Sequence, residues 1–189
     1  MATNTLRRAE WTEAATNYVL EHGLIGLSLR PLAADLGTSD RMLLYHFGSK
    51  DELVAAVLLA SNERSTAHVR AMEPSADLRH AVHDLWAAML IPQVDRCSRL
   101  YVEAAALGLL GKEPYATVVR EANEHWTSAM VDHLVRSGVR RPLARRATRI
   151  IDAAFMGFQL DLPLDVGTRE RHRAVADLAD AVGALEPSA

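Results

Sequence analysis

The sequence predicts an all-α protein of about nine helices, and three observations carry that prediction. Apolar residues recur at helical spacing along most of the 189 residues. Glycine and proline interrupt this spacing at intervals, as they do between helices. The chain is 49% hydrophobic but only 5% aromatic, and no segment shows a convincing strand pattern. We therefore expect helices packed on helices.

Composition indicates a chain that needs neither disulfides nor a membrane to fold. The single cysteine, Cys97, has no partner for an internal disulfide, which is typical of a reducing compartment. The first residues lack the apolar run of a secretory signal. The longest unbroken apolar run extends from Leu53 to Ala60, which is far too short to span a bilayer. These observations predict a cytoplasmic protein with no membrane partner.

Residues 28–53 contain the most informative pattern in the sequence, which begins with a short helix. Ser28 is a favoured N-cap residue, and the apolar residues after it recur at helical spacing as far as Leu36. Pro31 falls in the first turn, where its missing N–H removes no hydrogen bond. Gly37 follows, at the place of the left-handed residue that ends many helices.

A second short helix follows that glycine. Thr38 or Ser39 is expected to cap it, Gly48 ends it, and its residues Met42, Leu43 and Phe47 are spaced to pack inward. Ser49 then caps a third helix, with Glu52 completing a capping box. Two short helices joined by a tight, glycine-containing turn form a helix-turn-helix, whose second helix enters the major groove of DNA.

The same stretch resembles the N-terminal domain of the tetracycline-repressor (TetR) family of transcriptional regulators. The residues that carry the resemblance cover the first quarter of the chain: Ala14-Ala15, Gly23, Leu27-Ser28, Leu32-Ala33, Gly37-Thr38-Ser39, Leu43-Leu44-Tyr45-His46-Phe47, Ser49-Lys50-Asp51 and Leu53. The sequence departs from the family pattern at Leu44, where an aromatic residue is usual, and at Thr12, where an aliphatic one is usual. The resemblance implies a ligand-responsive repressor that binds a palindromic operator as a homodimer.

Residues on the outward side of the second helix are expected to contact double-stranded DNA. Arg41 is the candidate for a bidentate contact with a guanine edge. Leu44 or Met42 is the candidate for contact with a thymine methyl group, although Met42 suits the core equally well. For Arg41, a phosphate contact or an ion pair with Asp40 remain alternatives. The resemblance assigns phosphate and flanking-base contacts to Tyr45 and His46. The full predicted set is Ser28, Arg30, Thr38, Ser39, Asp40, Arg41, Leu44, Tyr45, His46 and Lys50.

Net charge does not by itself indicate a nucleic-acid partner. The whole chain carries a charge of −3, and the basic and acidic side chains of residues 1–50 balance. DNA binding therefore requires that the basic groups lie on the DNA side and most acids behind them.

The rest of the chain continues as helices. We predict helices at about 5–22, 49–72, 75–90, 94–110, 115–137, from 142 to Leu162 or Pro163, and at 168–185. Ser75 is expected to cap the third of these. The chain then divides into a helix-turn-helix DNA-binding domain at 1–50, a connecting helix at 51–73, and a helical effector-binding and dimerisation domain at 74–189.

The resemblance implies a small-molecule site among the central helices. Aromatic side chains and adaptable methionines there suit an apolar or aromatic effector, although each one taken singly is more typical of plain core. No charged side chain stands out as an anchor. The candidate ligand-binding residues are Trp86, Met89, Cys97, Tyr101, Tyr115, Trp126, Met130, Phe155 and Phe158.

The last two predicted helices combine apolar stripes with small residues. Paired with their two-fold mates, they would form an intermolecular four-helix bundle. The alternative is that these stripes only complete the core of one chain. The predicted interface residues are Ile151, Ala154, Phe158, Val175, Leu178, Ala179 and Val182.

Two other functional classes compete with a DNA-binding regulator. A helical enzyme or metalloprotein with an incidental helix-turn-helix is one, since His80 with His83, and Glu121 with His125, have spacings that suit a metal on one helix face. A scaffold that uses the motif for protein contacts is the other. Nucleophile-elbow, phosphate-loop and Cys-x-x-Cys motifs are missing from the sequence. We therefore predict no catalytic activity, no cofactor and no metal.

Overall fold

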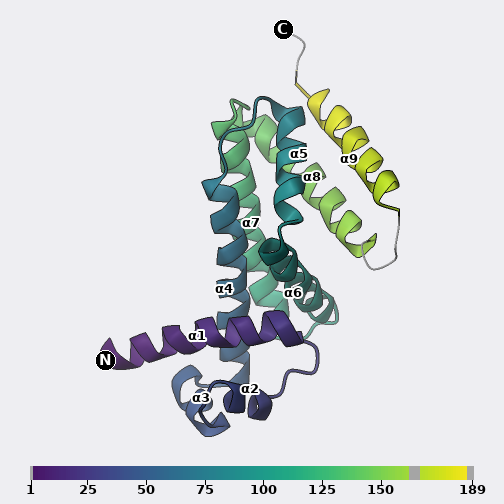
Figure 1. The fold of residues 1–189 in the computed structure, drawn as a ribbon. Coiled ribbons are helices and arrows are strands. Elements are labelled where there is room, and N and C mark those ends of the chain that lie inside the picture. The colour runs from purple at the N-terminus through teal and green to yellow at the C-terminus, as the bar shows by residue number, and fades with distance from the viewer. Residues whose placement is uncertain (1, 162–166, 187–189) are drawn as a thin grey trace. The chain divides into compact units, whose positions relative to one another are not determined.

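The computed structural model describes residues 2–161 and 167–186. Within those ranges the chain forms nine helices and no strand, which confirms the predicted all-α class (Figure 1). The helices are α1 (Ala2–His22), α2 (Leu29–Asp35), α3 (Asp40–Phe47), α4 (Lys50–Ala71), α5 (Leu78–Met89), α6 (Pro92–Leu109), α7 (Tyr115–Arg136), α8 (Arg141–Asp161) and α9 (Thr168–Gly183). The predicted end of the eighth helix, at Leu162 or Pro163, lies outside the described residues.

The helices pack as two compact units. The first unit comprises residues 1–65 and 92–125, and the second comprises residues 66–91 and 126–189. Helix α6 and the first half of α7, up to residue 125, therefore pack with the helix-turn-helix, although they come after α5 in the chain. The division into 1–50, 51–73 and 74–189 follows chain order, and it stays a prediction about function rather than about packing.

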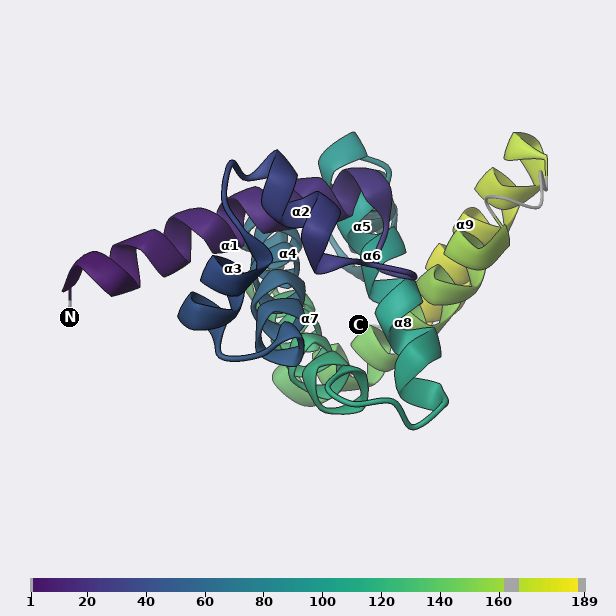
Figure 2. The same ribbon diagram turned by 90° about the horizontal axis from the view of Figure 1, so that it is seen from below.

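The core of the first unit is built around the helix-turn-helix. Helix α1 lies across α2 and α3 (Figure 1), and the view from below shows α2 crossing in front of α1 (Figure 2). The buried apolar side chains of this core come from α1, α2, α3, α4, α6, α7 and the α1–α2 loop: Ala15, Val19, Leu24, Leu27, Leu32, Ala33, Leu43, Phe47, Leu53, Val54, Val57, Leu58, Leu100, Ala104 and Val118.

One carboxylate ties α6 to the loop between α1 and α2. Gly23 ends α1 with a positive φ of 84°, a conformation that costs glycine little. The two backbone N–H groups that follow, of Leu24 and Ile25, both donate to Oε2 of Glu103 on α6, at 2.8 Å each. Hydrogen bonds to an ionised acceptor are stronger than neutral ones. Glu103 therefore positions the loop that leads into the helix-turn-helix.

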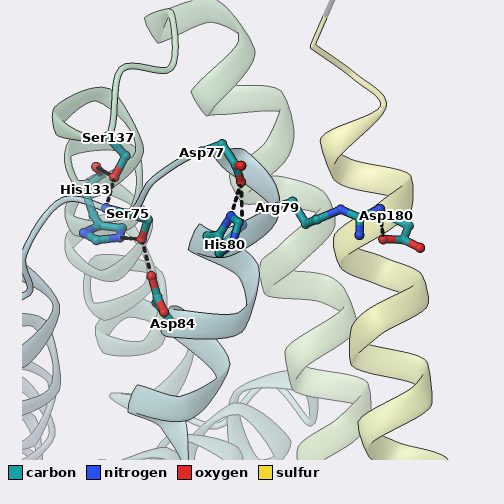
Figure 3. A network of polar contacts seen from close by, with 8 residues as sticks. All are labelled: Ser75, Asp77, Arg79, His80, Asp84, His133, Ser137 and Asp180. Atoms are coloured by element: carbon teal, nitrogen blue, oxygen red, sulfur yellow. Dashed lines mark hydrogen bonds and ion pairs between the residues drawn. The ribbon is translucent and has the colours of Figure 1, made fainter.

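The second unit packs α9 against α5 and α8 (Figure 1). Its fully buried large side chains include Leu78 and Leu85 of α5, and Ile151 and Phe155 of α8. Arg79 of α5 also forms an ion pair with Asp180 of α9 (Figure 3). The apolar face of α9 is therefore packed against helices of its own chain.

A polar network fixes the start of α5 and corrects one predicted cap. Asp77, not Ser75, is the N-cap, and its Oδ1 accepts the N–H of His80 at 2.8 Å. Ser75 instead donates its hydroxyl to Oδ2 of Asp84 at 2.6 Å and lies 3.2 Å from Nε2 of His133 (Figure 3). The N–H of Ser75 donates to Oγ of Ser137 at 2.9 Å. The side chains of Ser75, Asp84, His133 and Ser137 thus hold the loop between α4 and α5 in place.

His133 is fully buried in that network. Burial lowers the pKa of its imidazole below the ordinary 6.5, Arg136 lowers that pKa further, and Asp84 opposes the shift. The ring is therefore neutral at pH 7.

None of the described helices is long and apolar enough to cross a bilayer.

Candidate nucleic-acid interface

The turn between α2 and α3 has the geometry that the sequence predicts. Gly37 has a φ of 63°, its N–H donates to the carbonyl of Ala34 at 3.2 Å, and the N–H of Thr38 donates to the carbonyl of Ala33 at 2.9 Å. These two bonds are those of a Schellman motif. The chain therefore leaves α2 sharply enough to start α3 within a few residues.

Helix α3 is capped at both ends by the predicted residues. Ser39 is the N-cap, with its Oγ accepting the N–H of Met42 at 3.3 Å. Gly48, with a φ of 90°, donates its N–H to the carbonyl of Leu44 at 2.8 Å. The eight residues between them form one short, closed helix.

One side of α3 packs into the core and the other side faces solvent. Leu43 and Phe47 are buried, as predicted, whereas Met42 is 41% exposed. Of the two alternatives for Met42, core packing does not occur, because the two positions flanking Leu43 both lie on the open face of the helix. Leu44 is 39% exposed and Tyr45 is 72% exposed. A row of large side chains thus stands on the outward face of α3.

The cationic groups on this face are available to an anion. Arg30 on α2 and Arg41 on α3 are exposed, and within residues 2–161 and 167–186 no ion pair engages either guanidinium. The carboxylate of Asp40, the first residue of α3, accepts the backbone N–H of Arg41 at 2.9 Å. Its side chain is thereby turned to the backbone.

His46 lies between two aromatic rings. Its ring centroid is 4.6 Å from that of Trp11 on α1 and 5.2 Å from that of Tyr45, with both pairs edge-on. The imidazole Nδ1 is buried without a hydrogen-bond partner among the described residues. His46 therefore orients Tyr45 and joins α3 to α1, in addition to any contact with DNA.

Two polar residues support the motif differently from what the sequence suggests. Lys50 is exposed, and its Nζ donates to the carbonyl of Leu27. The ammonium group therefore stabilises the residues that lead into α2. Ser28 occupies the N-cap position of α2, but its side chain makes no capping hydrogen bond. Ser49 caps α4 through the N–H of Glu52 at 3.0 Å, and the carboxylate of Glu52 lies 3.9 Å from Arg8.

Comparison with known proteins identifies this motif. Residues 12–57 match the family model described as bacterial regulatory proteins, tetR family. Residues 12–57 therefore form a TetR-type regulatory domain. The match covers α2 and α3 entirely, so the outward face of α3 is that of a DNA-binding helix-turn-helix.

Solved structures of TetR-type regulators share the fold of the whole chain. A transcriptional regulator from Rhodococcus sp. Rha1 is 20% identical with a TM-score of 0.74, covering 93% of this chain and 95% of its own. The multidrug binding protein EbrR, complexed with imidazole, is 24% identical with a TM-score of 0.69, covering 97% and 96%. A TetR transcription regulator from Haloarcula marismortui is 22% identical with a TM-score of 0.65, covering 96% and 98%. Among curated proteins no sequence matches the chain.

The nine candidate ligand-binding residues are divided between the two units. Cys97, Tyr101 and Tyr115 belong to the first unit, and the other six, Trp86, Met89, Trp126, Met130, Phe155 and Phe158, belong to the second. Burial raises the pKa of the Cys97 thiol and of the Tyr115 phenol, which favours the neutral form of both groups.

Four of the six residues in the second unit take part in three contacts between α8 and neighbouring helices. Trp86 of α5 packs against Phe155 and Phe158 of α8, with ring centroids 5.1 and 5.6 Å apart. Trp126 of α7 donates its indole N–H to Oδ1 of Asp152 on α8 at 2.9 Å. Asp152 was not among the predicted residues, because a single carboxylate 26 residues from its partner leaves no local pattern in the sequence.

Burial divides the predicted dimer-interface residues. Ile151, Val175, Ala179 and Val182 have at most 2% of their surface exposed within one chain, because α9 packs on α5 and α8 of its own chain. Their burial favours the alternative that these stripes complete the core of one chain, and the interface itself stays a prediction. Ala154, Phe158 and Leu178 are partly exposed and remain candidates.

The metal alternative receives no support from the described part of the chain. There, no three His, Cys, Asp or Glu side chains converge as metal ligands. His80 is engaged with Asp77, whose Oδ1 lies 2.8 Å from its Nδ1. One pocket of about 370 Å³ lies in the first unit between the end of α1 and α6, and one of about 220 Å³ lies in the second unit beside Arg140 and Arg146. Neither pocket is lined by the candidate ligand-binding residues.

Proposed function

We propose that the chain is a ligand-responsive repressor. It forms a homodimer, and each copy contacts one half of a palindromic operator through α3. The observation that supports this most is the outward face of α3, where Arg41, Leu44 and Tyr45 are exposed above buried Leu43 and Phe47. A helix of eight residues, capped at both ends, presents these side chains from a rigid base.

Each outward residue has a distinct proposed role at the DNA. Arg41 reads a guanine edge in the major groove, and Leu44 contacts a thymine methyl group. Tyr45, held by His46, contacts phosphate and a flanking base. Lys50 and Arg30 contact phosphates, together with the backbone near Ser28, while Thr38, Ser39 and Asp40 position the start of the helix.

The experiment that tests DNA binding is a selection from randomised DNA with the purified full-length chain. We expect the enriched sequences to contain an inverted repeat whose half-site centres are about one helical turn, or about 34–36 Å, apart or a multiple of that. The logarithm of the affinity should fall linearly with the logarithm of salt concentration. A scaffold that uses the motif for protein contacts would enrich no sequence and show no such slope.

The homodimer is proposed to form through the open faces of α8 and α9. On α8, Ile150 and Leu160 are 43% and 55% exposed, with Ala153 and Gly157 exposed between them. A Cβ added at Gly157 would meet no described atom within 4 Å, so its own chain does not require a glycine there. Apolar residues around two small ones suit a close approach of the same helix from a second copy.

The dimer is tested with Ala153→Glu, which places a charge on that open face without touching the core. We expect the variant to sediment as a monomer and to lose affinity for the palindrome while keeping its thermal unfolding transition. An unchanged dimer would place the interface on another face. Ala181→Glu, at an exposed position of α9, maps how far the interface extends.

The response to a small molecule is proposed for the second unit. Its support is the aromatic cluster of Trp86, Phe155 and Phe158, which suits a small apolar or aromatic effector. A structure with a similar fold is that of the multidrug binding protein EbrR. We propose a cytoplasmic regulator without catalytic activity, whose effector must bind its DNA-free state more tightly than its DNA-bound state.

A further inference from the structure

A carboxylate in the second unit has hydrogen-bonding capacity to spare. Asp152, in the middle of α8, accepts one hydrogen bond from the indole of Trp126 at 2.9 Å. Burial raises the pKa of this carboxyl group, and the indole N–H only partly offsets the shift. Asp152 forms no ion pair with any described residue. A carboxylate can accept several hydrogen bonds, and Asp152 is partly exposed, so its remaining acceptor sites are open to solvent or to another molecule.

Two further polar groups share the side of α8 that carries Asp152. Thr148 precedes it by four residues and Gln159 follows it by seven, which places all three along one stripe of the helix. Oγ1 of Thr148 and Oε1 of Gln159 are buried, and neither hydrogen-bonds to a described residue. We call Thr148, Asp152 and Gln159 the polar stripe of α8.

Such groups are rare in folded proteins, because a buried polar atom without a partner costs free energy. Here two of them lie on one helix face, on either side of an incompletely satisfied carboxylate. Phe155 lies on the same face, between Asp152 and Gln159. An arrangement of this kind is typical of a surface that completes its hydrogen bonds with another molecule.

Aromatic rings accompany the polar stripe. Trp126 is hydrogen-bonded to Asp152, and Trp86 packs against Phe155 and Phe158. Trp86 is 4% exposed, and its Nε1 is a further buried donor with no partner among the described residues. Asp152 and Gln159 are about 10 Å apart along the helix axis at 1.5 Å per residue. This span is comparable with the length of a fused aromatic ring system.

The charge of the missing partner follows from the carboxylate. Removing a carboxylate from water costs free energy that a counter-charge restores. A cation supplies that counter-charge and is also attracted to the faces of indole and phenyl rings. A neutral molecule leaves the carboxylate without a counter-charge, and an anion is repelled.

We propose that the polar stripe of α8 binds a cationic aromatic molecule, with Asp152 as its charge anchor. The inference rests on the proposed ligand-responsive function and narrows its effector from apolar or aromatic molecules to aromatic cations. Asp152 is the anchor that the sequence analysis did not find.

The test compares two probes of the same shape, 1-methylquinolinium and its neutral counterpart 1-methylnaphthalene. Binding to the full-length chain is measured by calorimetry and by quenching of tryptophan fluorescence. We expect the cation to bind roughly tenfold or more tightly than the neutral probe, which corresponds to about 1.4 kcal/mol. Equal affinities, or no binding of the cation, would overturn the proposal.

Asp152→Asn separates the charge of the side chain from its hydrogen bond. The amide oxygen of asparagine still accepts the indole N–H of Trp126, so the fold is preserved while the charge is removed. We expect the cation to lose roughly tenfold in affinity and the neutral probe to bind as before. A preference for the cation that survives in Asp152→Asn would show that Asp152 only holds Trp126.

Two control variants complete the series. Trp126→Phe frees an oxygen of Asp152 but keeps the charge, so the preference for the cation should remain. Asp177→Asn removes an exposed carboxylate of α9 in the same unit, so it changes the net charge equally and should leave both affinities unchanged. An equal loss of cation affinity in Asp177→Asn would assign the effect to net charge and overturn the proposal.

Release of operator DNA, measured on the same proteins, distinguishes this inference from the proposed function. Binding of 1-methylquinolinium through Asp152 without release of DNA would support the inference and contradict the ligand-responsive function. Release of DNA by both probes alike, unaffected by Asp152→Asn, would support the function and overturn the inference.

Discussion

Helices α3 and α8 use their polar side chains in opposite ways. On α3 the backbone is capped at both ends, and the large side chains, such as Arg41 and Tyr45, point outward from a packed base. On α8 the polar atoms of Thr148 and Gln159 are buried without partners, beside the carboxylate of Asp152. Under the two proposals, the outward surface of α3 binds a large, charged partner, whereas the polar stripe of α8 binds a small one. Substitutions should therefore separate function from stability on α3 and couple them on α8.

The largest expected effect comes from the core of the second unit. Phe155→Ala removes a ring that is 2% exposed and packs against Trp86, which should lower the free energy of unfolding by about 3–5 kcal/mol. Urea denaturation at fixed protein concentration measures the change. Tyr45→Ala on α3 is the matched aromatic control and should stay within about 0.5 kcal/mol. A similar loss of unfolding free energy in both variants would contradict the expectation that α8 side chains stabilise the fold and outward α3 side chains do not.

A smaller effect, confined to DNA, is expected on α3. Arg41→Ala should reduce discrimination at one base position per half-site by about 1–3 kcal/mol, without shifting the unfolding transition. Competition binding against a panel of base substitutions measures it. Lys50→Ala is the comparison, since it should weaken all sequences alike and reduce the salt slope by about 1. Unchanged discrimination in Arg41→Ala would remove that residue from base reading.

The smallest expected effect is a pH dependence that originates in the second unit. The unfolded chain protonates His133 near its ordinary pKa of 6.5, whereas the folded chain does so only at lower pH. Below pH 6.5 the unfolded state therefore binds more protons, and the free energy of unfolding falls toward the folded pKa by at most about 1.4 kcal/mol per pH unit.

His133→Gln tests this dependence, because glutamine does not titrate and can still hydrogen-bond to Ser75. The stability of the variant should fall less steeply than that of the parent chain between pH 6.5 and 5. Parallel curves would mean that His133 takes up its proton equally in both states. His22→Gln, at an exposed position near the end of α1, is the control for removal of a histidine.

Signals carried by adjacent residues predicted much of the molecule correctly. Gly37, Ser39 and Gly48 end or start helices because their own conformation and side chains satisfy nearby backbone groups, and each does so in the structure. The same local rules gave the positions of the nine helices among the described residues. The family model then matched residues 12–57, where most of these signals occur.

Predictions failed where the deciding partner is distant in sequence. Ser75 has the chemistry of a cap, but His133 and Ser137 engage it from α7, and Asp77 takes the cap position. Spacing alone left Met42 open between the core and the DNA side, and in the structure the core accommodates its neighbour Leu43 instead. Asp152 gives no sequence signal, since only its pairing with Trp126 across two helices shows what it does.

The two hydrogen bonds that Glu103 accepts have a consequence for engineering. The amides of Leu24 and Ile25 belong to the segment that the family model covers, but their acceptor stands on α6, outside that segment. If this DNA-binding domain were fused to the C-terminal domain of another regulator, both amides would lose their hydrogen-bond acceptor. The fusion would need an acidic residue at the position of Glu103. Chimeric regulators built from this chain should accordingly carry α6 along with the first four helices.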